Sequence, residues 1–127
     1  MQTMKKIVLI ASAVVALAFA KPAQSQSVLT CQVIDDYIPV GENFAVDHEP
    51  AYIDGSTPGS RVNVRIGPGS EFEASAYGLV GDAVQVVGQA FSTNCDTWVQ
   101  VRFPISGHTG WVRSDFIRLH YGRGWWT

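Results

Sequence analysis

Apolar and polar residues alternate one by one in the stretch 61–66, where Val62, Val64 and Ile66 are separated by polar side chains. A period of two predicts a strand with one buried face and one solvated face. Pro68, between two glycines, ends this strand, because proline lacks the N–H that would continue a ladder. The stretch therefore enters a β domain and then turns sharply.

Similar apolar runs continue to residue 119, and no helical period of 3.6 residues follows the N-terminal segment. Strands are predicted at 61–66, 83–88, 97–103, 110–113 and 117–119, with one helical turn at 114–116. Residues 70–80 are expected to form a long loop. Five short strands within about 60 residues predict an all-β domain, a small closed barrel or roll.

The first segment reads as an export signal. Two lysines precede the uncharged apolar run 7–20, and small residues at Ala23 and Ser25 suit cleavage after Ser25. The run is short for a membrane span, although an uncleaved anchor is the alternative. We therefore expect 1–25 to be a signal peptide, and an exported protein, periplasmic or extracellular, with no stable membrane insertion after cleavage.

Residues 26–60 are expected to form an N-terminal extension and acidic linker. A short strand is predicted within 27–34, followed by six acidic residues and many prolines and glycines, with no basic residue before Arg61. Acidic oxygens suit calcium, but the regular spacing of a calcium loop is absent. A solvated acidic loop is the favoured interpretation.

Cys31 and Cys95 are the only cysteines. An even cysteine count in an exported chain predicts a disulfide, which would tie the extension to the barrel. Lipidation of Cys31 is the competing interpretation, since the preceding residues faintly resemble a lipobox, although Thr30 is a poor residue before a modified cysteine.

Once residues 1–25 are removed, the chain has six arginines and eleven acidic residues. An acidic protein is not expected to bind nucleic acid through phosphates or to be drawn to anionic lipid.

No motif predicts catalysis, a metal or a cofactor. The histidines at 48, 108 and 120 are isolated from one another in the sequence, which does not favour zinc. Cys95 could act as a nucleophile only if unpaired. We expect a protein that is not an enzyme and needs no cofactor and no metal.

The strand at 97–103 places Val99, Val101 and Phe103 on one side and Trp98 and Arg102 on the other. The valine side must face the core, so the alternation predicts that the Trp98 indole lies on the solvated face. The alternative is that Trp98 packs beneath a loop or the N-terminal segment.

The region 61–119 resembles the bacterial SH3-like (SH3b) domain family. The resemblance is carried by Val62–Arg65, Gly67–Gly69, Val84, Val86, Trp98–Arg102 and Gly110–Val112. It implies a five-stranded barrel without catalysis that binds cell-wall peptidoglycan or peptides. In the eukaryotic SH3 relatives a tryptophan at the place of Trp98 floors a peptide groove, and Arg113 and Phe116 stand where a proline and a tyrosine complete that groove.

A ligand surface is accordingly predicted from five side chains: Trp98, Trp111, Phe116, Arg102 and Arg113. Aromatic rings give contact area to a peptide or sugar, and a guanidinium orients a carboxylate. The predicted function is an exported binding module for cell-wall peptide or glycan. The alternative is an interaction or inhibitor module whose partner is another exported protein.

The aromatic C-terminal tail, residues 120–127, ends in two adjacent tryptophans, Trp125 and Trp126. Exposed indoles favour contacts, so the tail is expected either to fold back onto the barrel or to bind a partner.

Overall fold

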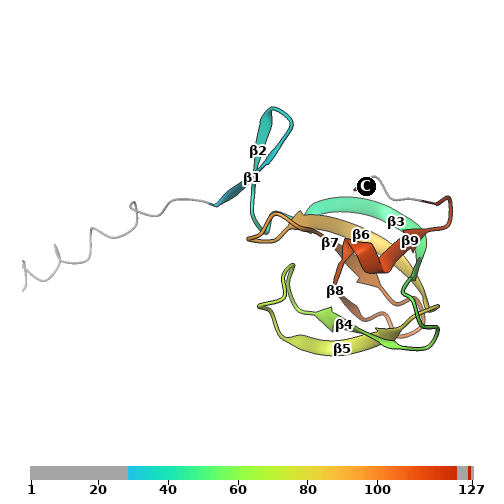
Figure 1. The fold of residues 1–127 in the computed structure, drawn as a ribbon. Coiled ribbons are helices and arrows are strands. Elements are labelled where there is room, and N and C mark those ends of the chain that lie inside the picture. The colour runs from blue at the N-terminus through green and yellow to red at the C-terminus, as the bar shows by residue number, and fades with distance from the viewer. Residues whose placement is uncertain (1–28, 123–125, 127) are drawn as a thin grey trace, which may run out of the picture.

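The computed structural model describes residues 29–122 and Trp126, and over them the protein is all-β (Figure 1). The strands are β1 (Thr30–Val33), β2 (Asp36–Pro39), β3 (Phe44–Ile53), β4 (Arg61–Arg65), β5 (Ala74–Leu79), β6 (Ala83–Phe91), β7 (Thr97–Arg102), β8 (Thr109–Arg113) and β9 (Ile117–Leu119). One 3-10 turn, η3 (Ser114–Phe116), joins β8 to β9. The all-β prediction and the single helical turn at 114–116 are confirmed.

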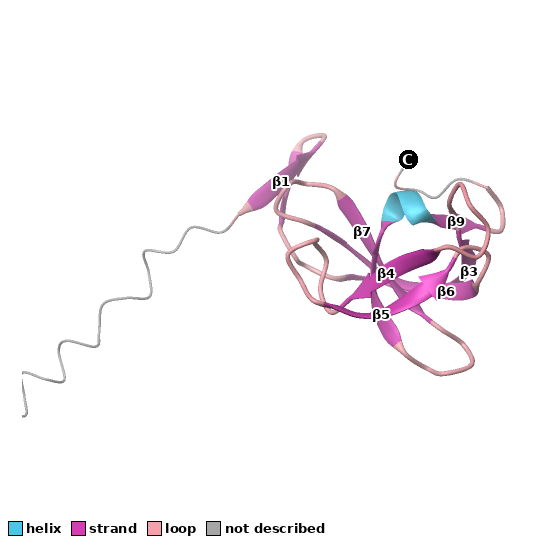
Figure 2. Cartoon of the chain, turned by 60° about the horizontal axis from the view of Figure 1, so that its bottom comes forward, coloured by secondary structure: helices cyan, strands magenta, loops and turns pink. Residues whose placement is uncertain are grey.

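Seven strands form one curved antiparallel sheet in the order β5-β4-β8-β7-β6-β3-β9, and β1 and β2 form a separate hairpin (Figures 1 and 2). The sheet is not closed, since β5 and β9 are its two edges. The prediction of a closed five-stranded barrel is therefore wrong in strand number and in closure. The two additional strands of the sheet come from regions that lack a strong alternating pattern, described next.

The first additional strand lies in the predicted acidic linker. Strand β3 pairs with β6 along most of its length and with β9 at its C-terminal end. Ala51 and Ile53 are fully buried, whereas the preceding half is mostly exposed and its register with β6 shifts between Ala45 and Glu49. Two neighbours supply enough backbone pairing to order a segment whose sequence alone reads as irregular. The linker prediction is thus wrong for 44–53, and also for 36–39, where β2 pairs with β1.

The second additional strand lies in the predicted loop 70–80. Strand β5 pairs antiparallel with β4 over its whole length, Arg61 lying opposite Leu79. Most β5 side chains are exposed, and only Gly78 is buried, so this edge strand has little apolar pattern to detect. Beyond β4, Ile66 is 60% exposed, because the strand ends at Arg65 and the alternation no longer sets its orientation.

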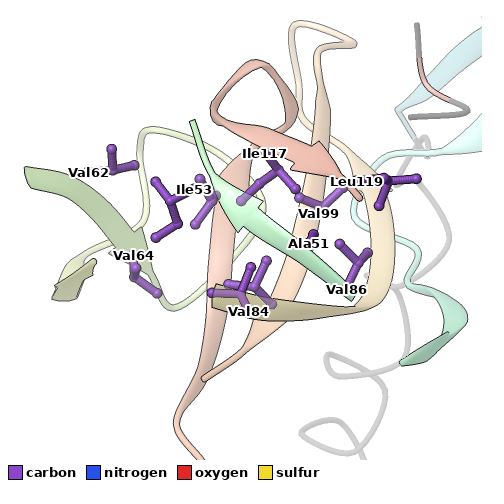
Figure 3. Packing of buried hydrophobic residues seen from close by; sticks show 11 residues of the cluster. Ala51, Ile53, Val62, Val64, Val84, Val86, Val99, Ile117 and Leu119 are labelled. Atoms are coloured by element: carbon purple, nitrogen blue, oxygen red, sulfur yellow. The ribbon is translucent and has the colours of Figure 1, made fainter. Parts of the chain in front are cut away.

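The main core lies inside the curve of the sheet (Figure 3). Val62 and Val64 contribute from β4, as the alternation predicted, and Val99 and Val101 from β7 are both fully buried. The whole cluster is Ala51, Ile53, Val62, Val64, Val84, Val86, Val99, Val101, Val112, Ile117 and Leu119. It consists of aliphatic side chains, most of them valines, whose branched Cβ suits the pleated surface of a sheet.

Close packing of β4 against β8 depends on Gly110. A Cβ at this position would collide with the Val64 side chain and lie 3.1 Å from the Arg65 carbonyl oxygen. The absence of a side chain at Gly110 therefore lets the two strands meet, at the point where Arg65 pairs with Trp111.

The predicted disulfide between Cys31 and Cys95 is present. It connects the β1–β2 hairpin, which extends away from the sheet in Figure 1, to the loop 92–96 between β6 and β7. A hydrogen bond also joins the end of the hairpin to β6, because the Gly41 amide donates to the Phe91 carbonyl at 2.9 Å. The expected link between extension and sheet domain is confirmed.

At the C-terminus, Trp126 is half-buried and packs against the main core. This residue therefore folds back on the sheet domain, one of the two outcomes expected for the tail.

No helix within residues 29–122 is long and apolar enough to cross a membrane. The predicted signal peptide, 1–25, lies outside the described residues.

Candidate functional site

A cavity of about 360 Å³ opens between β4, the loop 92–96 and the end of β8, and we call it the β4 pocket. Its lining residues are Arg61, Val62, Asn63, Arg65, Ser70, Glu71, Ser92, Thr93, Asn94, Asp96, Trp98, Arg113 and Phe116. The volume falls within the range of roughly 300–1,000 Å³ that is usual for small-ligand pockets.

Three of the five predicted ligand residues, Trp98, Arg113 and Phe116, line this pocket. They come from β7, the end of β8 and η3, so the fold brings together side chains separated by up to 18 positions in the chain. Trp111 and Arg102 are not among the lining residues.

The Trp98 indole is 6% exposed, so the expectation that it lies in solvent is wrong. The alternation itself holds, because Trp98 lies in a second small cluster with Ala90 and Trp111, apart from the valines of the main core. Ala90 from β6 and Trp111 from β8 lie beside Trp98 on the face opposite the main core. Trp98 is a packing residue that also borders the β4 pocket.

The Trp98 Nε1 atom is buried and has no hydrogen-bond partner among the described residues. A buried donor without an acceptor typically costs about 1–3 kcal/mol. Buried indoles usually find a partner for this N–H, so its orphan state is an unusual feature at the border of a pocket.

Trp111 is 7% exposed and packs beside Trp98. The Trp111 side chain is covered and lies outside the β4 pocket, so the pocket lends no support to its predicted place in the ligand surface. Arg102 stands at the opposite end of β7 from Trp98, paired with Thr109, and its Nη1 donates to Gln85 Oε1 at 3.3 Å. Arg102 therefore lies outside the β4 pocket, because the strand separates it from Trp98.

Arg113 is held by Asp115. Its Nε and Nη2 atoms donate to the two carboxylate oxygens at 2.7 and 2.8 Å, and its guanidinium lies 5.5 Å from the centre of the Phe116 ring. The hydrogen bonds and charge of Asp115 raise the pKa of Arg113 further above its ordinary value. Arg113 is therefore a fixed cation, already engaged by an acidic neighbour.

Two further cations, Arg61 and Arg65, were not among the predicted ligand residues. They lie with Asn63 on the face of β4 opposite Val62 and Val64, so the same period of two that predicted the strand identifies their shared face. The Arg61 guanidinium lies over the Tyr77 ring at 4.2 Å, and Arg65 Nη1 donates to the Phe72 carbonyl at 2.9 Å. Neither arginine forms an ion pair with another described residue.

The opposite wall, the loop 92–96, is a tight hydrogen-bonded turn. The Ser92 amide donates to the Asp96 carbonyl at 3.0 Å, and Ser92 Oγ accepts from the Asp96 amide at 3.2 Å. Cys95 adopts a left-handed φ of 63° in this turn. Its disulfide to Cys31 fastens the loop to the β1–β2 hairpin.

The lining of the β4 pocket includes hydroxyl groups from serine and threonine but no histidine, lysine or thiol. Over residues 29–122 no group of three histidine, cysteine or carboxylate side chains is arranged to hold a metal ion. What the pocket offers is a set of hydrogen-bond donors and aromatic edges, an arrangement suited to holding a polar ligand.

Comparison with known proteins gave one informative similarity. A serine/threonine-protein kinase D from Synechocystis sp. is 30% identical over 65 residues, which is 51% of this chain and 13% of the kinase. The chain thus matches only about an eighth of that protein's length. No family model and no solved structure matched.

Proposed function

We propose that this protein is an exported, non-catalytic binding module that recognises a cell-wall peptide or glycan through the β4 pocket. The observation that carries the proposal is the convergence of Trp98, Phe116 and Arg113 on one cavity that also presents the guanidinium groups of Arg61 and Arg65. Such a mixture of ring edges and oriented donors is typical of sites that bind polar chains.

Membership of the bacterial SH3-like family is part of this proposal. Its motif residues occupy strands β4, β6, β7 and β8 and the turn at 67–69. The similarity to 13% of a serine/threonine-protein kinase supports a domain-sized segment that also occurs joined to other domains. The disulfide supports an oxidising compartment.

A sedimentation assay with purified peptidoglycan tests the proposal, using a matched pair of phenylalanine variants. Phe116 and Phe103 are both half-buried against the main core, but only Phe116 lines the β4 pocket. Phe116→Ala should weaken sedimentation by more than about 5-fold relative to Phe103→Ala, since truncating an interface anchor typically costs over about 1 kcal/mol. Failure of the wild-type protein to sediment would refute cell-wall recognition.

The alternative, an interaction or inhibitor module for another exported protein, is favoured by a different surface. Three large apolar side chains of the β1–β2 hairpin and its flank are strongly exposed, namely Leu29 at 61%, Ile34 at 86% and Tyr37 at 66%. Clustered exposed apolar residues are typical of protein-binding sites. Recovery of one exported protein on the immobilised wild type, lost in Ile34→Ser, would support this alternative, whereas equal recovery on both would count against the hairpin.

A further inference from the structure

The charges lining the β4 pocket differ in sign from those of the chain around it. Residues 29–122 contain five arginines and eleven acidic residues. The pocket lining contains three arginines and only two acidic residues, Glu71 and Asp96. An acidic protein thus gathers most of its described arginines at one cavity, which favours an anionic group on the ligand.

The three pocket arginines are not equivalent. Arg113 already has a two-point contact with the Asp115 carboxylate. Arg61 and Arg65 have no acidic partner in the described part of the chain. A guanidinium carries five N–H donors, so the hydrogen bond of Arg65 to the Phe72 carbonyl leaves donors for a ligand.

Both arginines are nevertheless held in position. The Tyr77 ring supports the Arg61 guanidinium from below at 4.2 Å, and the Phe72 carbonyl anchors Arg65. Both side chains start from one strand face, four residues apart. Holding a flexible cation before the ligand arrives reduces the ordering cost of binding, so each arginine is a preorganised donor.

The neighbouring wall is aromatic. The Trp98 side chain is 6% exposed and borders the pocket, and its Nε1 atom is buried away from the cavity surface. The wall of β4 therefore suits a carboxylate, and the Trp98 side supplies apolar contact.

We propose that the β4 pocket is a receptor site for a peptide with a carboxylate, which the guanidinium group of Arg61 or Arg65 binds at the β4 wall. This inference rests on the proposed function and narrows its ligand from peptide or glycan to an anionic peptide. Arginine suits the role because its planar fork matches the two carboxylate oxygens.

The test measures binding of the purified, disulfide-intact protein to acetylated tetrapeptides made in pairs, with a free C-terminal carboxylate or a C-terminal amide. Chitotetraose serves as the neutral glycan probe. The free acid should bind about 10- to 100-fold more tightly than its amide, as expected for a charge-assisted contact. Salt should weaken binding of the acid more than of the amide.

At least one of the variants Arg61→Gln and Arg65→Gln should reduce acid binding and shrink the difference between acid and amide. Arg118→Gln is the control, because Arg118 lies outside the pocket and is paired with Asp54. Melting temperatures of all variants separate lost binding from lost folding.

Equal binding of acid and amide, unchanged by either pocket-arginine variant, would overturn the carboxylate site while leaving a peptide-binding module. Binding of chitotetraose alone would also overturn it and would leave the proposed function standing. If neither these probes nor peptidoglycan bind, the proposed function fails together with the inference.

Discussion

Trp98 shows how one side chain serves packing and a candidate site together. It shares a small cluster with Ala90 and Trp111, and it also borders a cavity whose other walls come from β4 and the loop 92–96. Substitution at Trp98 is therefore expected to change both stability and binding, so a binding defect in Trp98→Ala would not by itself identify a contact.

Trp98→Ala should lower the free energy of unfolding by about 3–5 kcal/mol, because it removes a large buried side chain and leaves a cavity. Trp98→Phe should cost clearly less, since it retains a ring and also removes the unsatisfied Nε1–H. Urea denaturation of the two variants measures both values. A loss below about 1 kcal/mol in Trp98→Ala would show that the indole is not packed as described.

Asp54 gives a pH prediction. Its carboxylate accepts hydrogen bonds from Arg118 Nε and Nη2 at 3.0 and 2.8 Å, and these bonds lower its pKa below the ordinary value of 3.8. A carboxyl group with a lowered folded pKa stabilises the fold above its unfolded pKa, and this contribution is lost as pH falls through the folded pKa. The pair is exposed, so the contribution is small.

NMR titration of the Asp54 side-chain carboxyl should therefore give a midpoint below 3.8 in the wild type and a higher midpoint in Arg118→Gln. An unchanged Asp54 midpoint in the variant would rule out Arg118 as the cause.

At the scale of elements, the loop 92–96 connects the disulfide to the candidate site. Four of its five residues line the β4 pocket, and the fifth, Cys95, is bonded to Cys31 in the hairpin. The hairpin forms no ladder with the seven-stranded sheet. The disulfide thus holds the loop 92–96, one wall of the β4 pocket, against the β1–β2 hairpin. Few other contacts among the described residues join the hairpin to the sheet.

The double variant Cys31→Ser with Cys95→Ser should lose about 4 kcal/mol of unfolding free energy, the chain-entropy value for a crosslink spanning 64 residues. It should also bind ligand more weakly than the wild type under conditions where both are folded, because the turn at Ser92 loses its anchor. Denaturation and binding measured on the same samples distinguish the two effects. Unaltered ligand affinity in the folded variant would show that hydrogen bonds alone position the loop.

At the scale of the whole molecule, the described residues are acidic and disulfide-bonded, and the C-terminal Trp126 packs against the core. These properties are compatible with an exported domain. The export proposal itself depends on residues 1–25.

Cleavage after Ser25 predicts an N-terminus at Gln26 in the protein recovered from outside the cytoplasm. Intact-mass measurement without reduction should give the mass of residues 26–127 less two hydrogens for the disulfide. A mass that retains residues 1–25 would instead indicate an uncleaved segment, and the export assignment would then need a different basis.

The alternation of apolar and polar residues determined the all-β class, the position of most strands and the face on which each side chain lies. Val62, Val99 and Trp98 all lie on the face that the period of two assigns to them. The cysteine count and the export signal together predicted the pairing of Cys31 with Cys95. These properties are local or compositional, so a single sequence contains them.

Tertiary structure decided three features that the pattern did not. These are the burial of Trp98, the ordering of β3 and the distance of Arg102 from the β4 pocket. A strand's pattern specifies which way a side chain points, but burial depends on the neighbours that the fold gathers around it, here Ala90 and Trp111 from adjacent strands. Strand β3 forms because two distant neighbours, β6 and β9, satisfy its backbone groups. The pocket arginines of β4 likewise become a candidate site only because a loop about 30 residues further along the chain encloses them.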